Sequence, residues 1–213
     1  MTKIQLLSDT HSRRFEIDPS VNFAIHAGDI TNTGFRQHTL TWDESIISFE
    51  KSKQPIYWVP GNHDINFKED TELGTGNFNV LNKVATYIEP TFNYTTEKRL
   101  TIKGVSLSVC YNLPALASYW DFMTANRYDE KEYYEKQLDK YYDIIVSHSP
   151  PNGDIGSEIE CGDIGSGCLL EYIEEYQPKL VVCGHVHHPL TRKTVIGKTT
   201  VINVAQDSVI YNI

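Results

Sequence analysis

The chain has 213 residues, of which 40% are hydrophobic and 22% are charged, and its formal net charge is -9. This composition predicts one folded domain over residues 1–213 and excludes an intrinsically disordered chain. The negative charge, and the lack of any Lys/Arg run longer than a pair, disfavour binding to extended nucleic acid.

No apolar run approaches the roughly 18 to 20 residues that a membrane-spanning helix requires. The first residues predict a strand. They have neither the long apolar core nor the small-residue cleavage site of a secretory signal. We therefore expect a cytoplasmic protein without a membrane partner. The cysteines form no Cys-x-x-Cys pair and are expected to be reduced thiols that serve mostly in packing. They are Cys110, Cys161, Cys168 and Cys183.

The first half of the chain alternates short apolar runs with polar stretches. Strands are predicted over residues 3–8, 21–27 and 54–59, with a helix over 36–52. The order strand, helix, strand predicts a parallel sheet. A second, short helix is predicted over residues 78–85.

The second half begins with a predicted hairpin, in which residues 99–102 and 105–110 flank a Lys103-Gly104 turn. Further elements are predicted as helices over 130–142 and 167–176, strands over 143–146 and 179–183, and antiparallel strands over 190–195, 199–204 and 208–211. Together these elements predict an α/β fold, a four-layer α/β/β/α sandwich of two mixed sheets flanked by helices.

Histidines gather at the ends of the predicted strands. Five of the eight follow a strand directly: His11, His63, His148, His185 and His187. Strand ends are where α/β folds bind their ligands. A lone histidine there is usually a packing residue, but five of them, with Asp9 and Asp29, would repel one another or lose hydration unless something paired them. A metal ion pairs such groups, and imidazole with carboxylate suits zinc, manganese, iron or nickel.

The spacing of these residues supports the same interpretation. In Asp9-Thr10-His11 and in Gly184-His185-Val186-His187, two ligands lie on one side of an extended segment because side chains alternate. The segments Gly28-Asp29 and 61–64 each begin with a glycine, which permits tight turns and close approach of a ligand. Each short pattern is weak, and their order along successive strands makes the signal strong.

In this order the motifs resemble those of the calcineurin-like metallophosphoesterases, over roughly residues 4–205. The resemblance implies a phosphoesterase with two divalent transition-metal ions, manganese being favoured over iron, zinc or nickel. Carried over by position, the metal ligands are Asp9, His11 and His187 for one ion, Asn62, His148 and His185 for the other, and Asp29 as the bridge. His63 takes the place of the catalytic histidine near the leaving group.

The residues at 147–151 and 165–167 narrow the resemblance to small single-domain members, including the class that contains the brain metallophosphodiesterases. In that class a loop with proline and tryptophan follows the middle hairpin, and the segment 113–122 is similar to it.

The chain departs from the Ser/Thr protein phosphatases of this family. Those proteins have Asp-Arg-Gly after Gly-Asp, and the aspartate orients the catalytic histidine. Here Asn32 takes the aspartate position, Thr33 takes the arginine position, and the motif at 61–64 ends in Asp64 instead of Glu. Protein phosphatase activity is therefore disfavoured. The group that orients His63 stays open, and Asp64 is either that group or a purely structural residue.

The favoured hypothesis is hydrolysis of small phosphodiesters, with cyclic nucleotides among the candidates, by a metal-activated hydroxide. His63 would protonate the leaving group, and Asn62 would also touch a phosphate oxygen. The alternatives are a phosphomonoesterase or nucleotidase, a nuclease, and a non-catalytic scaffold that has lost its metals. The charge disfavours the nuclease, and the complete ligand set disfavours the scaffold. The sequence leaves the oligomeric state open.

Overall fold

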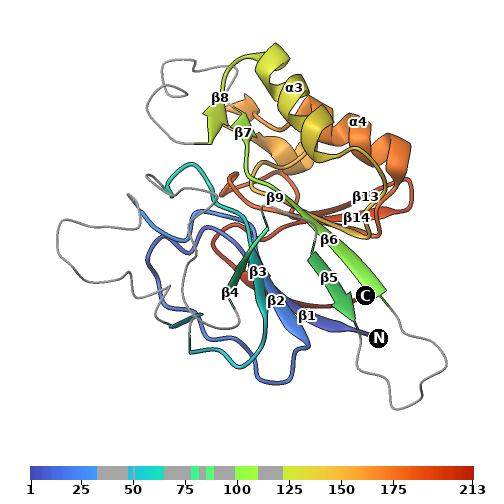
Figure 1. Cartoon of the computed structure of the whole chain (residues 1–213). Coiled ribbons are helices and arrows are strands. Elements are labelled where there is room, and N and C mark those ends of the chain that lie inside the picture. Colours follow the sequence, from blue (N-terminus) through green and yellow to red (C-terminus); the bar gives the residue numbers. More distant parts are fainter. Residues whose placement is uncertain (33–47, 50, 65–77, 82–84, 89–98, 110–121) are drawn as a thin grey trace.

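The computed structural model describes residues 1–32, 48–49, 51–64, 78–81, 85–88, 99–109 and 122–213. In these parts of the chain, two mixed β-sheets pack face to face, and helices α3 (Arg127–Gln137) and α4 (Gly167–Tyr176) cover the outer face of the second sheet (Figure 1). The predicted α/β fold with two mixed sheets is confirmed. Of the predicted helix over 36–52, only residues 48–49 are described as helical, and the rest lies almost wholly outside the described residues.

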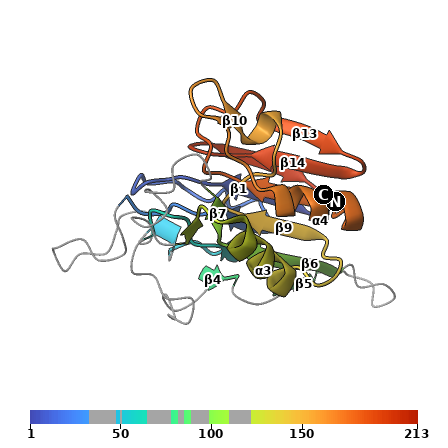
Figure 2. The same cartoon turned by 90° about the horizontal axis from the view of Figure 1, so that it is seen from above.

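The first sheet carries the N-terminal strands in the order β15-β1-β2-β3-β4. Its members are β1 (Lys3–Leu7), β2 (Phe23–His26), β3 (Ile56–Trp58), β4 (Phe78–Val80) and β15 (Ser208–Asn212). The parallel arrangement predicted for the first three strands is confirmed, β4 adds a fourth parallel strand, and β15 pairs antiparallel with β1. Pairing between Thr2 and Ile213 brings the two ends of the described chain together (Figure 2).

The second sheet has the order β13-β14-β12-β9-β6-β5. Its members are β5 (Ala85–Ile88), β6 (Arg99–Val105), β9 (Ile144–Ser147), β12 (Leu180–Cys183), β13 (Lys193–Ile196) and β14 (Thr199–Asn203). The four inner strands are parallel, and the edge strands β5 and β13 are antiparallel. Smaller elements are β7 (Ser108–Val109), β8 (Met123–Thr124), the 3-10 turn η1 (Asp154–Gly156), β10 (Ser157–Glu158) and β11 (Gly162–Asp163).

Alternation along the strands divides the apolar side chains between layers. In β1, Ile4 and Leu6 enter the core between the two sheets, whereas Leu7 packs on the outer face of the first sheet with Phe49 and Trp58. A separate cluster joins the second sheet to α3 and α4. These clusters hold the two sheets against each other and hold the helices against the second sheet.

Two sequence predictions are wrong. The hairpin at Lys103-Gly104 is absent, since β6 runs unbroken through both residues. A Cβ atom at position 104 would lie 2.5 Å from side-chain carbons of Leu81 and Val59, which leaves no room for a larger residue. Gly104 therefore permits close packing and does not form a turn. The predicted helix over 78–85 is replaced by β4 and the start of β5, because backbone pairing with the neighbouring strands outweighs a short local pattern.

Smaller differences concern element ends and thiols. Helix α3 begins earlier than predicted, where the Asn126 side chain accepts a hydrogen bond from the Tyr128 amide, and it ends at Gln137. The three described cysteines are free, and they range from the buried Cys183 to the exposed Cys161, so the packing prediction holds only in part. Among the described helices, none has the length and apolar character needed to cross a bilayer.

Candidate metal centre

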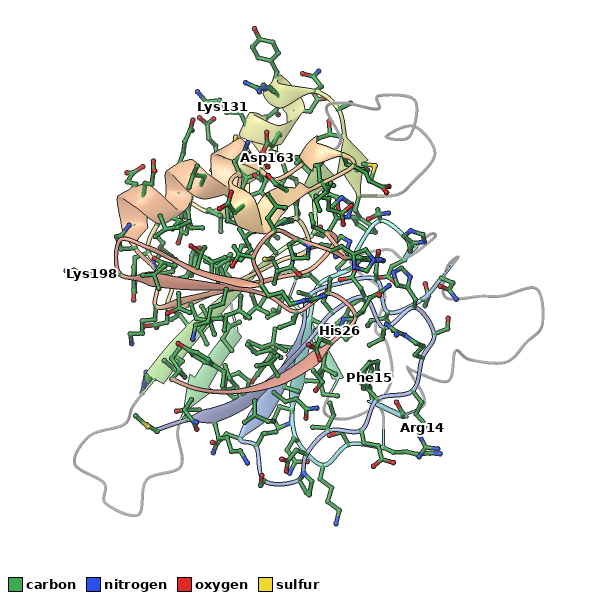
Figure 3. The ribbon with its side chains drawn as sticks, turned by 180° about the vertical axis from the view of Figure 1, so that it is seen from behind. Arg14, Phe15, His26, Lys131, Asp163 and Lys198 are labelled. Atoms are coloured by element: carbon green, nitrogen blue, oxygen red, sulfur yellow. The ribbon has the colours of Figure 1, made fainter. Side chains whose placement is uncertain are left out.

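The candidate site lies where strands of both sheets end, next to His26, the last residue of β2 (Figure 3). The turns after β1 and β2 continue side by side, because the amides of Asp9 and His11 donate to the carbonyls of Gly28 and Asp29 at 2.9 and 3.0 Å. This pairing beyond the strands places the Asp-x-His and Gly-Asp motifs in contact.

The first predicted triad is assembled in the structure. His187 Nε2 lies 3.0 Å from Asp9 Oδ1 and 3.3 Å from His11 Nε2, and His11 Nε2 lies 3.9 Å from the same aspartate oxygen. Ligand atoms of the three residues all lie within 4.8 Å of one another. Two residues from the first sheet and one from the second thus converge on one point.

The second group surrounds His148, which is fully buried. Its Nδ1–H donates to the backbone carbonyl of Ala27 at 2.7 Å, which turns Nε2 towards Asn62 Oδ1 at 3.1 Å and Asp29 Oδ2 at 3.3 Å. The ring of His185 lies edge-on to it, with 5.0 Å between centroids. Asp29 Oδ2 also lies 3.8 Å from His11 Nε2, so one carboxylate contacts a histidine from each triad.

The backbone of this region is held in the left-handed conformation at several of the predicted ligands. The φ angles are positive at Asp9 (52°), His11 (45°), Asp29 (55°) and His185 (66°). Such conformations cost of the order of 1 kcal/mol each for non-glycine residues and gather at functional sites. The rest of the fold therefore stabilises a strained arrangement that local preference would not produce.

The motif glycines leave space for carboxylates and rings. A Cβ atom on Gly184 would overlap Ser8 and the Asp9 carboxylate, and one on Gly61 would overlap the Asp29 carboxylate. A Cβ atom on Gly28, where φ is 98°, would lie 2.5 Å from His148 Nδ1. The close approach predicted from these glycines is therefore present in the structure.

Burial and charge act in opposite directions on the site. Burial favours the neutral carboxyl groups, but the neighbouring histidines outweigh it and hold the pKa of Asp9 and of Asp29 below their usual range. Burial likewise opposes charge on His148, but the Asp29 carboxylate raises the pKa of that histidine to about 9. Burial lowers the pKa of His185 to about 4. Two ionised carboxylates among several imidazoles form a donor set that suits divalent transition metals.

His63 lies beside this donor set. Its amide donates to Asp29 Oδ1 at 2.8 Å, its ring meets His11 edge-on at 4.9 Å, and its Nδ1–H donates to the carbonyl of Asn32 at 2.7 Å. Asn32, which stands where the protein phosphatases have aspartate, thus orients the His63 ring through its backbone carbonyl.

Asp64 has a different task, which favours the structural interpretation of this residue. Its buried carboxylate accepts from the amides of Gly61 and Thr31, each at 2.9 Å, and from the Thr31 hydroxyl at 3.0 Å. Burial raises its pKa to about 7. Asp64 therefore fastens the 61–64 turn to the turn after β2.

Other polar residues near the site pack in the interior, lie at the surface or support a loop. His26 is buried against the Thr10 hydroxyl, at 3.1 Å, and burial lowers its pKa to about 3. His188 is exposed, and Asp163 caps the long loop by accepting from two glycine amides. His38, Thr33 and residues 113–121 lie outside the described residues.

Two arginines that no motif indicated support the ligand turns. Arg13 donates to the carbonyls of Asp9 and Thr10, both at 3.2 Å. Arg192 donates to the carbonyls of His187 and Ala205, both at 3.0 Å. Only the folded structure shows these contacts, because backbone carbonyls as partners leave no trace in the sequence.

Comparison with known proteins identifies the same family as the sequence motifs. The family model for calcineurin-like phosphoesterases matches residues 3–189. The UPF0046 protein K07C11.7 of Caenorhabditis elegans is 30% identical over 222 residues, covering 96% of this chain and 69% of that protein. A protein of Arcobacter nitrofigilis named probable glycerophosphodiester phosphodiesterase GpdQ is 28% identical over 201 residues, covering 90% of this chain and 65% of its own length.

Solved structures share the fold at low sequence identity. TT1561 of Thermus thermophilus has a TM-score of 0.57 at 12% identity, covering 96% of this chain and 89% of that chain. GAP50, described as the anchor in the inner membrane complex of Plasmodium, has a TM-score of 0.55 at 14% identity, with 96% and 71% covered. These similarities extend to the fold alone.

Proposed function

Because the chain belongs to the calcineurin-like phosphoesterase family, we propose that it hydrolyses small phosphodiesters at a two-metal centre. The observation that carries this proposal is the position of Asp29, whose Oδ2 lies 3.3 Å from His148 Nε2 and 3.8 Å from His11 Nε2. A carboxylate shared by histidines of both sheets has the placement that a bridging ligand needs.

The donor atoms divide around that bridge. Asp9, His11 and His187 would hold one ion, whereas the ligands of the other would be Asn62, His148 and His185, with manganese as the favoured metal. When bound, the two ions would supply Lewis-acid activation of the attacking water and neutralise charge at the phosphoryl group.

His63 would be the proton donor to the leaving group. Its Nδ1–H is bonded to the Asn32 carbonyl, so Nε2 is the nitrogen that can deliver a proton to the departing oxygen. The bond from its amide to Asp29 Oδ1 fixes its backbone relative to the bridge. Asn62 would contact a phosphoryl oxygen through its amide nitrogen, since its Oδ1 faces His148.

Within the described part of the chain, the arginines near the ligand turns donate to backbone carbonyls, and this supports a diester over a monoester. Arg13 and Arg192 both direct guanidinium nitrogens at backbone carbonyls of those turns. A monoester dianion carries more charge than a diester monoanion and gains more from side-chain cations aimed at the phosphate. The name of the Arcobacter relative, which refers to glycerophosphodiesters, supports the same class, and cyclic nucleotides are further candidates.

The proposal is tested by metal analysis of the purified protein, followed by turnover of matched substrates with added Mn²⁺. We expect two ions per chain and turnover of bis(p-nitrophenyl) phosphate at least about tenfold above that of p-nitrophenyl phosphate. Glycerophosphodiesters and cyclic nucleotides then rank the natural diester classes. Faster turnover of the monoester would indicate a phosphomonoesterase, and a folded protein that retains no metal would contradict the two-metal centre.

A further inference from the structure

The turn after β14 packs against the segment that carries His185 and His187. The buried Asn203 donates its amide to the Val186 carbonyl at 3.0 Å and accepts from the Ala205 amide at 2.9 Å. Arg192 joins the carbonyls of His187 and Ala205, at 3.0 Å each. The backbone of the turn and the backbone of the ligand segment are thus fixed relative to each other.

Gln206 lies in this turn in the left-handed conformation, with φ of 60°. Its amide donates to the Ser8 carbonyl at 3.1 Å, which fastens the turn beside Asp9. Its side-chain amide lies 2.9 Å from His187 Nδ1, whereas His187 Nε2 lies 3.0 Å from Asp9 Oδ1. Both nitrogens of one predicted ligand are therefore engaged, one inside the metal centre and one outside it.

We propose that Gln206 is a positioning residue that holds the His187 imidazole in the orientation required for metal binding. This role rests on the proposed function. An imidazole binds a metal through its unprotonated nitrogen, so the other nitrogen carries the hydrogen and needs an acceptor. A glutamine amide offers an accepting oxygen and a donating nitrogen at nearly the same place, and a half-turn exchanges them. Gln206 can therefore pair with His187 both before and after metal binding.

The size of the expected effect follows from exposure. Loss of a partner outside the ligand set typically lowers metal affinity 10- to 100-fold. Gln206 is exposed, so water can partly replace its hydrogen bond, and the lower end of that range applies. We expect a loss of about tenfold at the ion held by His187.

The test is calorimetric titration of the metal-stripped full chain with Mn²⁺, for wild type and three variants. Gln206→Met keeps the length of the side chain without its hydrogen bond and should weaken one of two sites about tenfold. Gln206→Glu supplies an acceptor and should restore wild-type affinity. The matched control is Gln54→Met, which removes an exposed amide bonded to the Pro19 carbonyl at 2.9 Å, just before β3 and thus at the opposite end of that strand from the site. It should bind like wild type.

A second measurement separates positioning from folding. The ¹⁵N chemical shifts of the His187 ring, recorded without metal, should change in Gln206→Met and not in Gln54→Met, with equal melting temperatures for the two. Equal metal affinity of Gln206→Met and Gln54→Met would overturn the role of Gln206, as would equal weakening by Gln206→Met and Gln206→Glu. Wild-type protein that binds no Mn²⁺ would overturn the metal centre itself, and this role with it.

Discussion

The two halves of the proposed metal centre differ in their access to water. In the closed half, formed by Asn62, His148 and His185, the central histidine is fully buried and is fixed by a backbone carbonyl. In the open half, formed by Asp9, His11 and His187, the His187 side chain is 31% exposed and its outer nitrogen meets an exposed glutamine. The ring of His63 meets the open half at His11.

This difference indicates a division of tasks between the halves. Donors that are already desolvated and fixed by the main chain lose little freedom when an ion binds, so the closed half should retain its ion more tightly. The open half, with its solvent access and neighbouring His63, is where a substrate can approach. A chelator should accordingly remove one ion before the other.

The largest effect is expected from Asp29, the residue that both halves share. Asp29→Asn keeps the shape of the side chain and removes its charge, so it should reduce the metal content. Loss of a residue that only supports a metal ligand costs up to about 100-fold in affinity or activity, and loss of the bridging ligand itself should lower turnover by more than that. Metal analysis and kinetics check this. Asp18→Asn, the same change at a half-exposed carboxylate before β2, should leave both unchanged. A folded Asp29→Asn protein with two ions and normal turnover would contradict the bridge.

The next largest effect is expected from His63, which lies beside the open half. His63→Ala should keep both ions and lose about 10²- to 10⁴-fold in turnover of diesters with alkoxide leaving groups. The loss should be much smaller with p-nitrophenolate, which leaves without a proton. His188→Ala removes an exposed histidine near the same ligand segment and should change turnover little. Equal losses on both leaving groups would argue against a proton donor.

The pH dependence of metal binding should distinguish the closed half. Asp29 raises the pKa of His148 to about 9 in the metal-free protein, so an incoming ion must displace a proton below that pH. The apparent affinity should therefore rise about tenfold per pH unit between pH 7 and 9 and level off above that range. Calorimetry in buffers of different ionisation enthalpy measures the released proton. An affinity that stays constant across this range would contradict the displacement of a proton from His148 by the ion.

The smallest effect is expected at Gly184, where a Cβ atom would overlap the Ser8 side chain and the Asp9 carboxylate of the open half. Gly184→Ala should displace the Asp9 carboxylate, cost about 1–3 kcal/mol of folding free energy and lower the metal content towards one ion. In Gly162→Ala, by contrast, φ is +72° and no atom lies within 4 Å of the new carbon. It should cost about 1 kcal/mol and keep two ions. Equal metal content in the two variants would contradict the packing argument.

The turns that carry the predicted ligands could be located from the sequence because the strands before them have a local pattern. Asp9, His11 and Asp29 each follow a buried strand within a few residues, and such strands have a clear apolar pattern. The parallel sheet then follows from the order of elements, and the meeting of the turns follows from the sheet. The family resemblance added the division of ligands between two ions, which no spacing contains.

The wrong prediction at Gly104 and the contacts that the sequence left open share a physical cause, since each concerns a residue whose environment comes from distant parts of the chain. Gly104 resembles a turn residue until Leu81 and Val59 are placed against it. The orientation of His63 depends on a main-chain carbonyl of Asn32, and that of His187 on Gln206, which lies beyond the matched family region. Contacts of this kind are invisible to local pattern, because any residue type can supply a carbonyl.

The origin of the ligands has a consequence for the lifetime of the fold. Asp9, His11 and Asn62 follow strands of the first sheet, whereas His148, His185 and His187 follow strands of the second. Each ion would therefore act as a cross-link between the sheets, in addition to the apolar layer that they share. Ions that bind only the folded chain stabilise it by mass action, by about 2.7 kcal/mol at a free concentration 100 times the dissociation constant. Cellular metal supply would then govern how long the protein survives as well as how fast it works.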